Sequence, residues 1–194
     1  MKRILCMILA VALLLCGCAA KPVEDTHPEW DATWFRAGDV LAAEPPSGFE
    51  LNESNDVLSV SGLYYATWTQ GEAREIVSDT GRDATAYDAQ IYLLVKECKN
   101  AELAETEALD WIEREQGTYE TDPLSECPAN GQCWRILPLR SGRETNPYQS
   151  GRAAFTVRGD VAICVELLCA EGYAGDAEEI LNQFLAGFHF HEGE

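Results

Sequence analysis

The sequence predicts an α+β fold in which a mostly antiparallel β-sheet packs with two main helices. From residue 48 onward, short stretches of alternating apolar residues dominate the chain and indicate strands. One helical pattern, at residues 101–116, interrupts these strands, and a second helical pattern follows the last of them. Runs of strands separated by a few helices are typical of this class, whereas a parallel sheet needs strands and helices in alternation.

The clearest element is a hairpin of strands 152–157 and 161–168, joined at Gly159-Asp160. Gly followed by Asp supplies the positive-φ conformations that a two-residue hairpin turn needs. The odd-numbered residues of the second strand place large aliphatic side chains on one face, so we expect that face in a core. The helix that follows should lie across the hairpin. Its apolar residues are Tyr173, Ala177, Ile180, Leu181, Phe184, Leu185 and Phe188.

Other elements precede the hairpin. Large apolar residues on both faces of 87–97 predict a central strand. The helix at 101–116 has Asn100 as its N-cap and Gly117 as its C-terminal stop. The remaining stretches that indicate strands are 49–51, 57–60, 63–69, 73–77 and 134–139.

The first residues predict export. Lys2-Arg3 precede an apolar run at 4–15, which is too short to span a bilayer and is typical of a signal peptide. Leu15-Cys16-Gly17-Cys18 resembles the bacterial lipobox, although Cys16 departs from the usual pattern. The resemblance implies cleavage after residue 17 and acylation of Cys18, and hence a lipid anchor on the extracytoplasmic side of the cell membrane or outer membrane. Ordinary secretion with cleavage after Ala20 is the alternative.

Composition divides the rest of the chain. Residues 18–47 are rich in Pro, Asp, Glu and Ala, and predict an N-terminal tether. Trp30, Trp34 and Phe35 are its large apolar residues, and we expect them to dock on the domain. Residues 48–191 are long enough for a single domain with its own core, which leaves 192–194 as a tail.

The charge balance limits the classes of partner that the chain can bind. The chain has 14 Lys and Arg against 33 Asp and Glu, a formal net charge of −19. Such a surface repels phosphate backbones, so we expect no nucleic-acid partner. Contact with a membrane is expected through the lipid at Cys18 and not through a basic patch.

No catalytic motif is present, and we expect no cofactor and no metal. His189 and His191 stand two residues apart beside Glu192, but two histidines at a chain end lack the further ligands that a metal site needs. The loop at 79–83 lacks the alternating carboxylates of a calcium loop. Arg158-Gly159-Asp160 matches the tripeptide that integrins recognise, yet Gly-Asp is also ordinary turn chemistry.

Five cysteines fall within the domain, in a compartment where disulfides persist. We predict a bridge between Cys127 and Cys133, because Pro128 and Asn130-Gly131 can bring the ends of this short loop together. A second bridge, between Cys98 and Cys169, would join two strand ends. Cys164 lies an odd number of residues from Cys169, so it should point to the opposite face and remain a free, buried thiol.

The order of elements resembles the Mog1/PsbP-like superfamily. The resemblance covers roughly 48–191. Its matching features are the helix at 103–115, the strand at 134–139, the hairpin tip at 158–160, and the last helix with Phe188 and Phe190. It implies an antiparallel sheet between helices, and it implies no function, because the superfamily includes photosystem accessory proteins, a nuclear-transport cofactor and many bacterial lipoproteins. A cystatin-like or other α+β arrangement stays open.

Taken together, these features favour an envelope-anchored, non-catalytic binding or accessory module, whose partner is an envelope protein or a small ligand. The alternative is an envelope hydrolase that uses a pair of carboxylates. Carboxylates are so abundant here that the sequence singles out no such pair.

Overall fold

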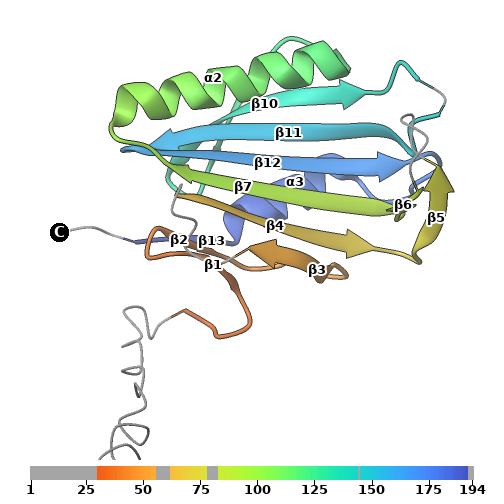
Figure 1. Cartoon of the computed structure of the whole chain (residues 1–194), viewed down its shortest axis with the longest axis horizontal. Helices are drawn as coiled ribbons and strands as arrows, with labels where there is room; N and C mark the ends of the chain where they lie inside the picture. The colour runs from red at the N-terminus through yellow and green to blue at the C-terminus, as the bar shows by residue number, and fades with distance from the viewer. Residues whose placement is uncertain (1–29, 56–61, 78–82, 144, 192–194) are drawn as a thin grey trace, which may run out of the picture.

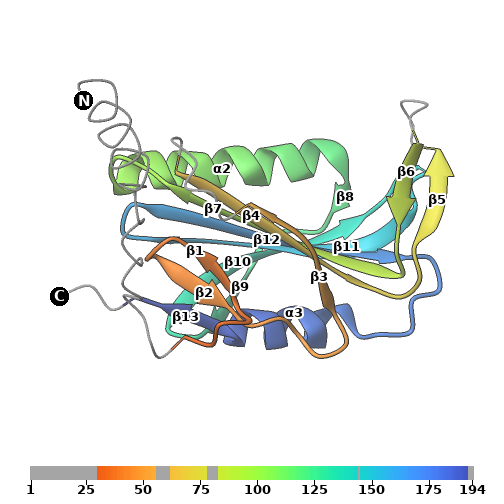
Figure 2. The same cartoon turned by 60° about the horizontal axis from the view of Figure 1, so that its bottom comes forward.

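A large antiparallel sheet forms the middle of three layers in the computed structural model, which describes residues 30–55, 62–77, 83–143 and 145–191. Helix α2 (Ala101–Thr118) covers one face, and helix α3 (Ala177–Ala186) lies on the other (Figure 1; Figure 2). The predicted α+β class, with a mostly antiparallel sheet and two helices, is therefore confirmed. No helix in the described part of the chain is long and apolar enough to cross a membrane.

Eight strands make up the large sheet. In spatial order they are β3 (Glu50–Asn55), β4 (Leu63–Gln70), β7 (Ala89–Glu97), β12 (Val161–Ala170), β11 (Tyr148–Arg158), β10 (Gln132–Arg140) and β8 (Glu120–Thr121), while β9 (Ser125–Ala129) also pairs with β10. A separate two-stranded hairpin consists of β5 (Arg74–Val77) and β6 (Asp83–Ala86). β7 lies between β4 and β12, so the prediction of a central strand is confirmed.

The hairpin of β11 and β12 has the predicted turn. Arg158 pairs with Val161, and Gly159 has φ +60°, which favours glycine. Both faces of β12 are buried, not one face only. Val161, Ile163, Val165 and Leu167 face one core, and Ala162, Cys164 and Leu168 face a second core beneath α2. The second core exists because α2 packs on β11 and β12, which the strand pattern alone could not show.

Helix α2 begins as predicted and ends later. The Asn100 side chain accepts a hydrogen bond from the Leu103 backbone N–H at 2.9 Å. The helix continues through Gly117 to Thr118, because the Tyr119 backbone N–H still donates to the Glu115 carbonyl at 2.9 Å. The predicted stop at Gly117 is therefore wrong. A glycine lowers helix stability without ending the helix when the next hydrogen bonds form.

The opposite face holds a small sheet. Strands β1 (Phe35–Ala37), β2 (Leu41–Ala43) and β13 (Phe188–Phe190) form it beside α3. Trp30 and Phe35 are each 5% exposed, so they are docked on the domain. Part of the segment interpreted as a tether, 18–47, thus belongs to the folded layer.

Several predicted features lie outside the described residues. These are the signal peptide at 1–17, the start of the tether with Cys18, the strand expected at 57–60, most of the loop at 79–83, and the tail at 192–194.

Candidate functional site

Residues from distant parts of the chain meet at one end of the sheet, which we call the aromatic end. It comprises Trp34, the Asn130-Gly131 turn, the β11–β12 tip at Arg158, and the strand β13 with His189 and Phe190. The tip belongs to the left end of the sheet in Figure 1, near the label of the C-terminus. The sequence had singled out most of these residues for separate reasons, and the fold brings them together.

The aromatic end contains two adjoining open pockets. One has a volume of about 590 Å³ and is lined by Trp34, Gln132 and His189, among others. The other has a volume of about 470 Å³ and extends over the hairpin tip. Arg158 and Phe190 line both pockets and therefore form the ridge between them.

Stacking holds the side chains of the aromatic end. The Trp34 indole lies parallel to the His189 ring, with centroids 4.1 Å apart and planes 14° apart. The Arg158 guanidinium carbon lies 4.6 Å from the centre of the Phe190 ring, a cation–π contact. The Asn130 amide donates a hydrogen bond to the Phe188 carbonyl and attaches the turn to β13.

Arg158 differs from many of the other basic residues. Arg74, Arg114, Arg135, Arg140 and Arg152 each form an ion pair with a carboxylate. Within the described part of the chain, the Arg158 guanidinium forms no ion pair, although 33 Asp and Glu stand against 14 Lys and Arg in the sequence. Its N–H donors are thus available to a ligand, while the Phe190 ring holds the guanidinium plane in place.

A second arrangement lies beneath α2, where Glu115 of the helix meets Glu166 of β12. The Glu166 carboxyl lies beside the Glu115 carboxyl and the Tyr119 phenol. Burial, together with the charge and hydrogen bond of Glu115, raises the pKa of Glu166 to about 8. Arg114 holds Glu115 in an ion pair with an N–O distance of 3.1 Å, and the raised pKa leaves Glu166 protonated at neutral pH.

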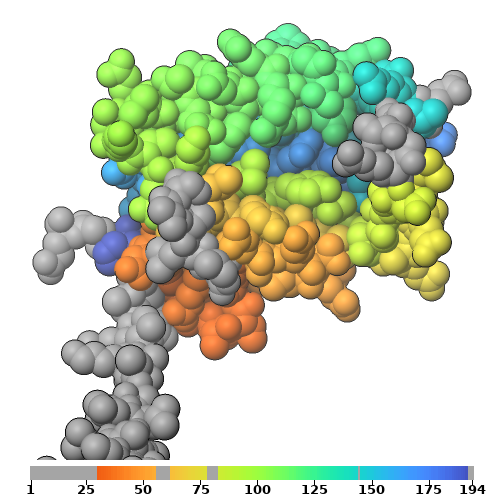
Figure 3. Space-filling view, viewed as in Figure 1, coloured from red at the N-terminus to blue at the C-terminus, as the bar shows by residue number. Residues whose placement is uncertain are grey.

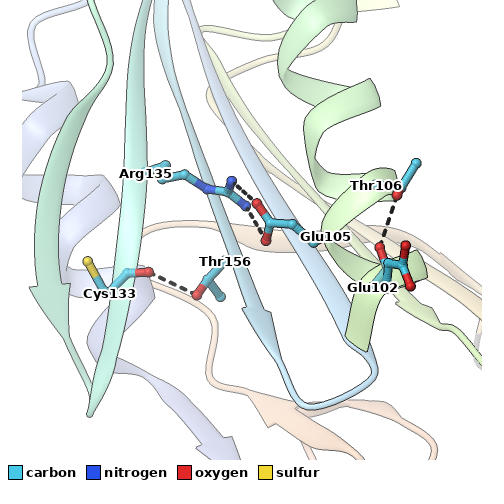
Figure 4. Close-up of polar contacts among 6 residues, drawn as sticks. All are labelled: Glu102, Glu105, Thr106, Cys133, Arg135 and Thr156. Carbon is cyan, nitrogen blue, oxygen red and sulfur yellow. Dashed lines mark hydrogen bonds and ion pairs between the residues drawn. The ribbon is translucent and has the colours of Figure 1, made fainter. Parts of the chain in front are cut away.

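The Cys127 and Cys133 side chains are not brought together. Across the β9–β10 pair, Cys127 lies opposite Trp134, while Cys133 lies opposite Pro128. Neighbouring residues of a strand point to opposite faces, so Cys127 lies against the core and Cys133 is exposed. In Figure 4 the Cys133 carbonyl accepts a hydrogen bond from the Thr156 hydroxyl, at 3.0 Å, and the thiol points away from it.

Cys98 and Cys169 lie at opposite ends of the sheet. Cys169 pairs with Ala89 at the start of β7, whereas the Cys98 backbone N–H donates to the Asp160 carbonyl beyond its end. Ala89 and Cys98 are nine residue steps apart along the strand, so the two strand ends lie about 30 Å from each other. All five described cysteines are free. Cys164 is buried on the face of the sheet opposite to Cys169, so the predicted direction of its side chain is confirmed.

The other candidate residues have structural roles. Among the described residues, no three His, Cys, Asp or Glu side chains are placed to hold one metal ion. His189 stacks on Trp34, and Gly159-Asp160 forms the hairpin turn. Arg135 forms an ion pair with Glu105 at 2.6 Å and so attaches α2 to β10 (Figure 4). The pair of Glu115 and Glu166 was not among the residues predicted from the sequence, because strand pairing and helix packing create it.

Fold and site define the chain as an α+β domain with an aromatic, arginine-bearing surface at one end of its sheet. No family model matches the chain, and no curated protein matches it. Among solved structures it is similar to cyanobacterial PsbP (CyanoP) from Synechocystis sp. PCC 6803, with 13% sequence identity and a TM-score of 0.48, covering 88% of this chain and 99% of that one. It is also similar to a protein from Bacteroides thetaiotaomicron VPI-5482, with 11% identity and a TM-score of 0.46, covering 79% of this chain and 46% of that one. The first belongs to the PsbP-like group that the sequence resembles, and both likenesses concern the fold alone.

Proposed function

We propose that this chain is a non-catalytic binding or accessory module, anchored by a lipid on Cys18 to the extracytoplasmic side of a bacterial membrane, and that the aromatic end is its binding surface. The observation that carries the proposal is the Arg158 guanidinium, stacked on Phe190 and without an ion pair among the described residues. An arginine left unpaired in a chain of net charge −19 is suited to a partner that brings its own anion.

The chemistry of the pockets indicates the partner's character. Trp34 and Phe190 offer aromatic surface, Asn130 and Gln132 offer amide groups, and Arg158 offers paired donors. A ligand that carries a carboxylate beside an apolar or ring-shaped part fits this set, whether it is a small molecule or a segment of an envelope protein.

The proposed anchor would hold this surface close to the membrane. Trp30 lines the larger pocket, and about 12 residues separate it from Cys18, a stretch that spans at most about 40 Å when fully extended. We therefore expect the partner to lie at the membrane surface or within that distance of it.

A hydrolase that uses a carboxyl pair is the second candidate, because Glu115 and Glu166 do form a pair. Glu115 is 5% exposed and lies under α2, and its charge is held by Arg114. A general acid or base must reach the bond that reacts, and Glu115 is covered by its own helix. The geometry therefore favours binding over hydrolysis.

Photo-cross-linking in a lipoprotein-processing bacterial host tests the proposal. A photoreactive residue at Gln132, on the pocket rim, should yield a defined cross-linked product, whereas one at Gln183, on the exposed side of α3, should not. The Arg158→Ala substitution should abolish that product and Arg158→Lys should weaken it, with unchanged circular dichroism in both variants. Identical products from both positions, or a product unaffected by Arg158→Ala, would refute the binding surface.

The anchor has a separate test. Cys18→Ser should release the protein from the membrane fraction or leave an unprocessed precursor. A membrane-bound product of mature size from this variant would contradict the lipid anchor, and it would leave the result at Gln132 unaffected.

A further inference from the structure

A row of side chains crosses the α2-side face of the large sheet. Strand pairing places Glu53 on β3 opposite Thr67 on β4, Thr67 opposite Tyr92 on β7, and Tyr92 opposite Glu166 on β12. Directly opposed residues of antiparallel strands point to the same face, so these four side chains stand side by side.

The row lies in a trough. Helix α2 packs on β11 and β12 but leaves β4 and β7 beside it. In the space-filling view a trough runs between α2 and β4, and atoms of β12 and β7 form its floor (Figure 3). We call this feature the tyrosine trough, defined by Glu53, Tyr65, Thr67, Tyr92, Tyr119 and Glu166.

Each side of the tyrosine trough has a carboxyl group paired with a phenol. The Tyr65 hydroxyl donates to Glu53 at 2.7 Å, and the Tyr119 phenol lies beside Glu166. Tyr92 lies between the two pairs. Burial, with added contributions from Tyr148, Glu166 and Glu53, raises its pKa far above the ordinary value. The trough therefore combines aromatic surface with a carboxyl group on each side.

The β4 side of the trough also holds a polar group without a partner. Thr67 is 5% exposed, and its hydroxyl oxygen has no hydrogen-bond partner within the described part of the chain. Its side chain points into the row between Glu53 and Tyr92. Buried hydroxyl groups in native proteins are nearly always paired, so an orphaned hydroxyl at the side of a trough indicates a place where a ligand completes the hydrogen bonding.

We propose that the tyrosine trough binds an organic ammonium ion. Tyrosine faces attract such cations through their ring quadrupoles, and the carboxyl groups beside them add charge complementarity. The Thr67 oxygen accepts an N–H donor where the ligand has one. A metal ion is disfavoured, because among the described residues no three ligating side chains converge on one point.

Binding is coupled to a proton on Glu166. The groups that face Glu166 are Glu115 and Arg114 from α2, Tyr119 after the helix, Tyr92 from β7 and Cys164 from β12 itself. A bound cation favours the carboxylate form, so the proton held between Glu166 and Glu115 leaves to solvent. Affinity should then rise with pH, by up to about tenfold per unit below pH 8, and level off above it.

Isothermal titration calorimetry on the full chain in detergent tests the proposal, with choline and putrescine as probes. We expect saturable binding of at least one probe, with an affinity about five to ten times higher at pH 7.5 than at pH 6.5. Two buffers of different ionisation enthalpy should reveal close to one proton released per site at pH 6.5.

Three variants make the test specific. Tyr92→Leu should weaken binding at least tenfold, and Glu166→Gln should remove the pH dependence and the proton release. Tyr173 is a half-buried tyrosine on the other side of the sheet, so Tyr173→Leu should leave the affinity, its pH dependence and the proton release unchanged. The proposal is wrong if neither probe binds, if Tyr92→Leu and Glu166→Gln bind as the parent does, or if calcium binds with the same dependence on both residues.

Discussion

Replacing Glu166 by Gln should make the protein more stable at alkaline pH, and the structure sets the size of the effect. In the unfolded chain the Glu166 carboxyl loses its proton near pH 4.5, whereas in the folded protein burial and Glu115 hold its pKa at about 8. Between these values the unfolded state binds fewer protons than the folded state, so the free energy of unfolding falls as pH rises. Glutamine has nearly the same shape and cannot ionise, so the variant lacks this loss.

The magnitude follows from the shift. Each pH unit between 4.5 and 8 lowers the free energy of unfolding of the parent by about 1.4 kcal/mol relative to the variant. Between pH 5.5 and 8.5 the parent should therefore lose about 3 kcal/mol more than Glu166→Gln, and the difference should stay constant above pH 8.5. Below pH 4.5 both forms of the side chain are neutral, and the two proteins should respond to pH alike.

Urea unfolding at pH 5.5, 6.5, 7.5 and 8.5, followed by tryptophan fluorescence, measures the difference. Urea is uncharged and leaves the ionic strength constant, so the comparison reports the carboxyl group alone. The control is Glu113→Gln on the exposed side of α2, which should follow the parent at every pH. Parallel pH profiles for the parent and Glu166→Gln would refute the assignment of a protonated Glu166, and with it the proton release expected in the tyrosine trough.

Three further outcomes are expected. In the native protein Cys133 should react with iodoacetamide within minutes, because it is exposed, and Cys164 should react only after unfolding, because burial raises the pKa of its thiol well above the ordinary value. Peptide mapping measures the modification of both cysteines. Modification of Cys164 at the rate of Cys133 would contradict the prediction. Gly151→Ala should lower the free energy of unfolding by about 1–3 kcal/mol, because the new Cβ would lie 2.3 Å from a β12 carbonyl oxygen. Gly117→Ala should raise the free energy of unfolding by up to about 1 kcal/mol, because no atom lies within 4 Å of the new Cβ. Equal effects of the two substitutions in urea unfolding would refute these expectations. Asn100→Ala should cost about 1 kcal/mol through the lost cap of α2, whereas Asn100→Asp should retain most of the stability.

Local chemistry accounts for the parts of the fold that the sequence predicted well. A two-residue turn at Gly159-Asp160 determines the β11–β12 register, and Asn100 determines where α2 begins. Each of these signals acts over a few residues, so no knowledge of the tertiary fold was needed. The class of the fold followed from the order of such elements.

The two disulfides were predicted from the spacing of the cysteines in the sequence, and spacing carries no information on the direction of the side chains. Cys127 and Cys133 lie close in the chain, but the β9–β10 register offsets them by one position and sends their side chains to opposite faces. Cys98 and Cys169 both flank strands, but antiparallel pairing places those strand ends far apart. A disulfide needs both distance and direction, and only the register supplies the direction.

The pair of Glu115 and Glu166 leaves one trace in the sequence that could have revealed it. The residues that share a face with Glu166 on β12 are Ala162, Cys164 and Leu168, all of them apolar, so a single carboxyl group interrupts an otherwise apolar row. On a solvent-facing strand its neighbours at two-residue spacing would be polar as well. A lone acid in such a row predicts a covered face with a buried carboxyl group, whose pKa must rise unless a cation meets it. The formal net charge of −19 counts Glu166 as ionised and therefore overstates the negative charge of the folded protein at neutral pH. A cation that reaches the trough would favour the carboxylate form and restore that charge.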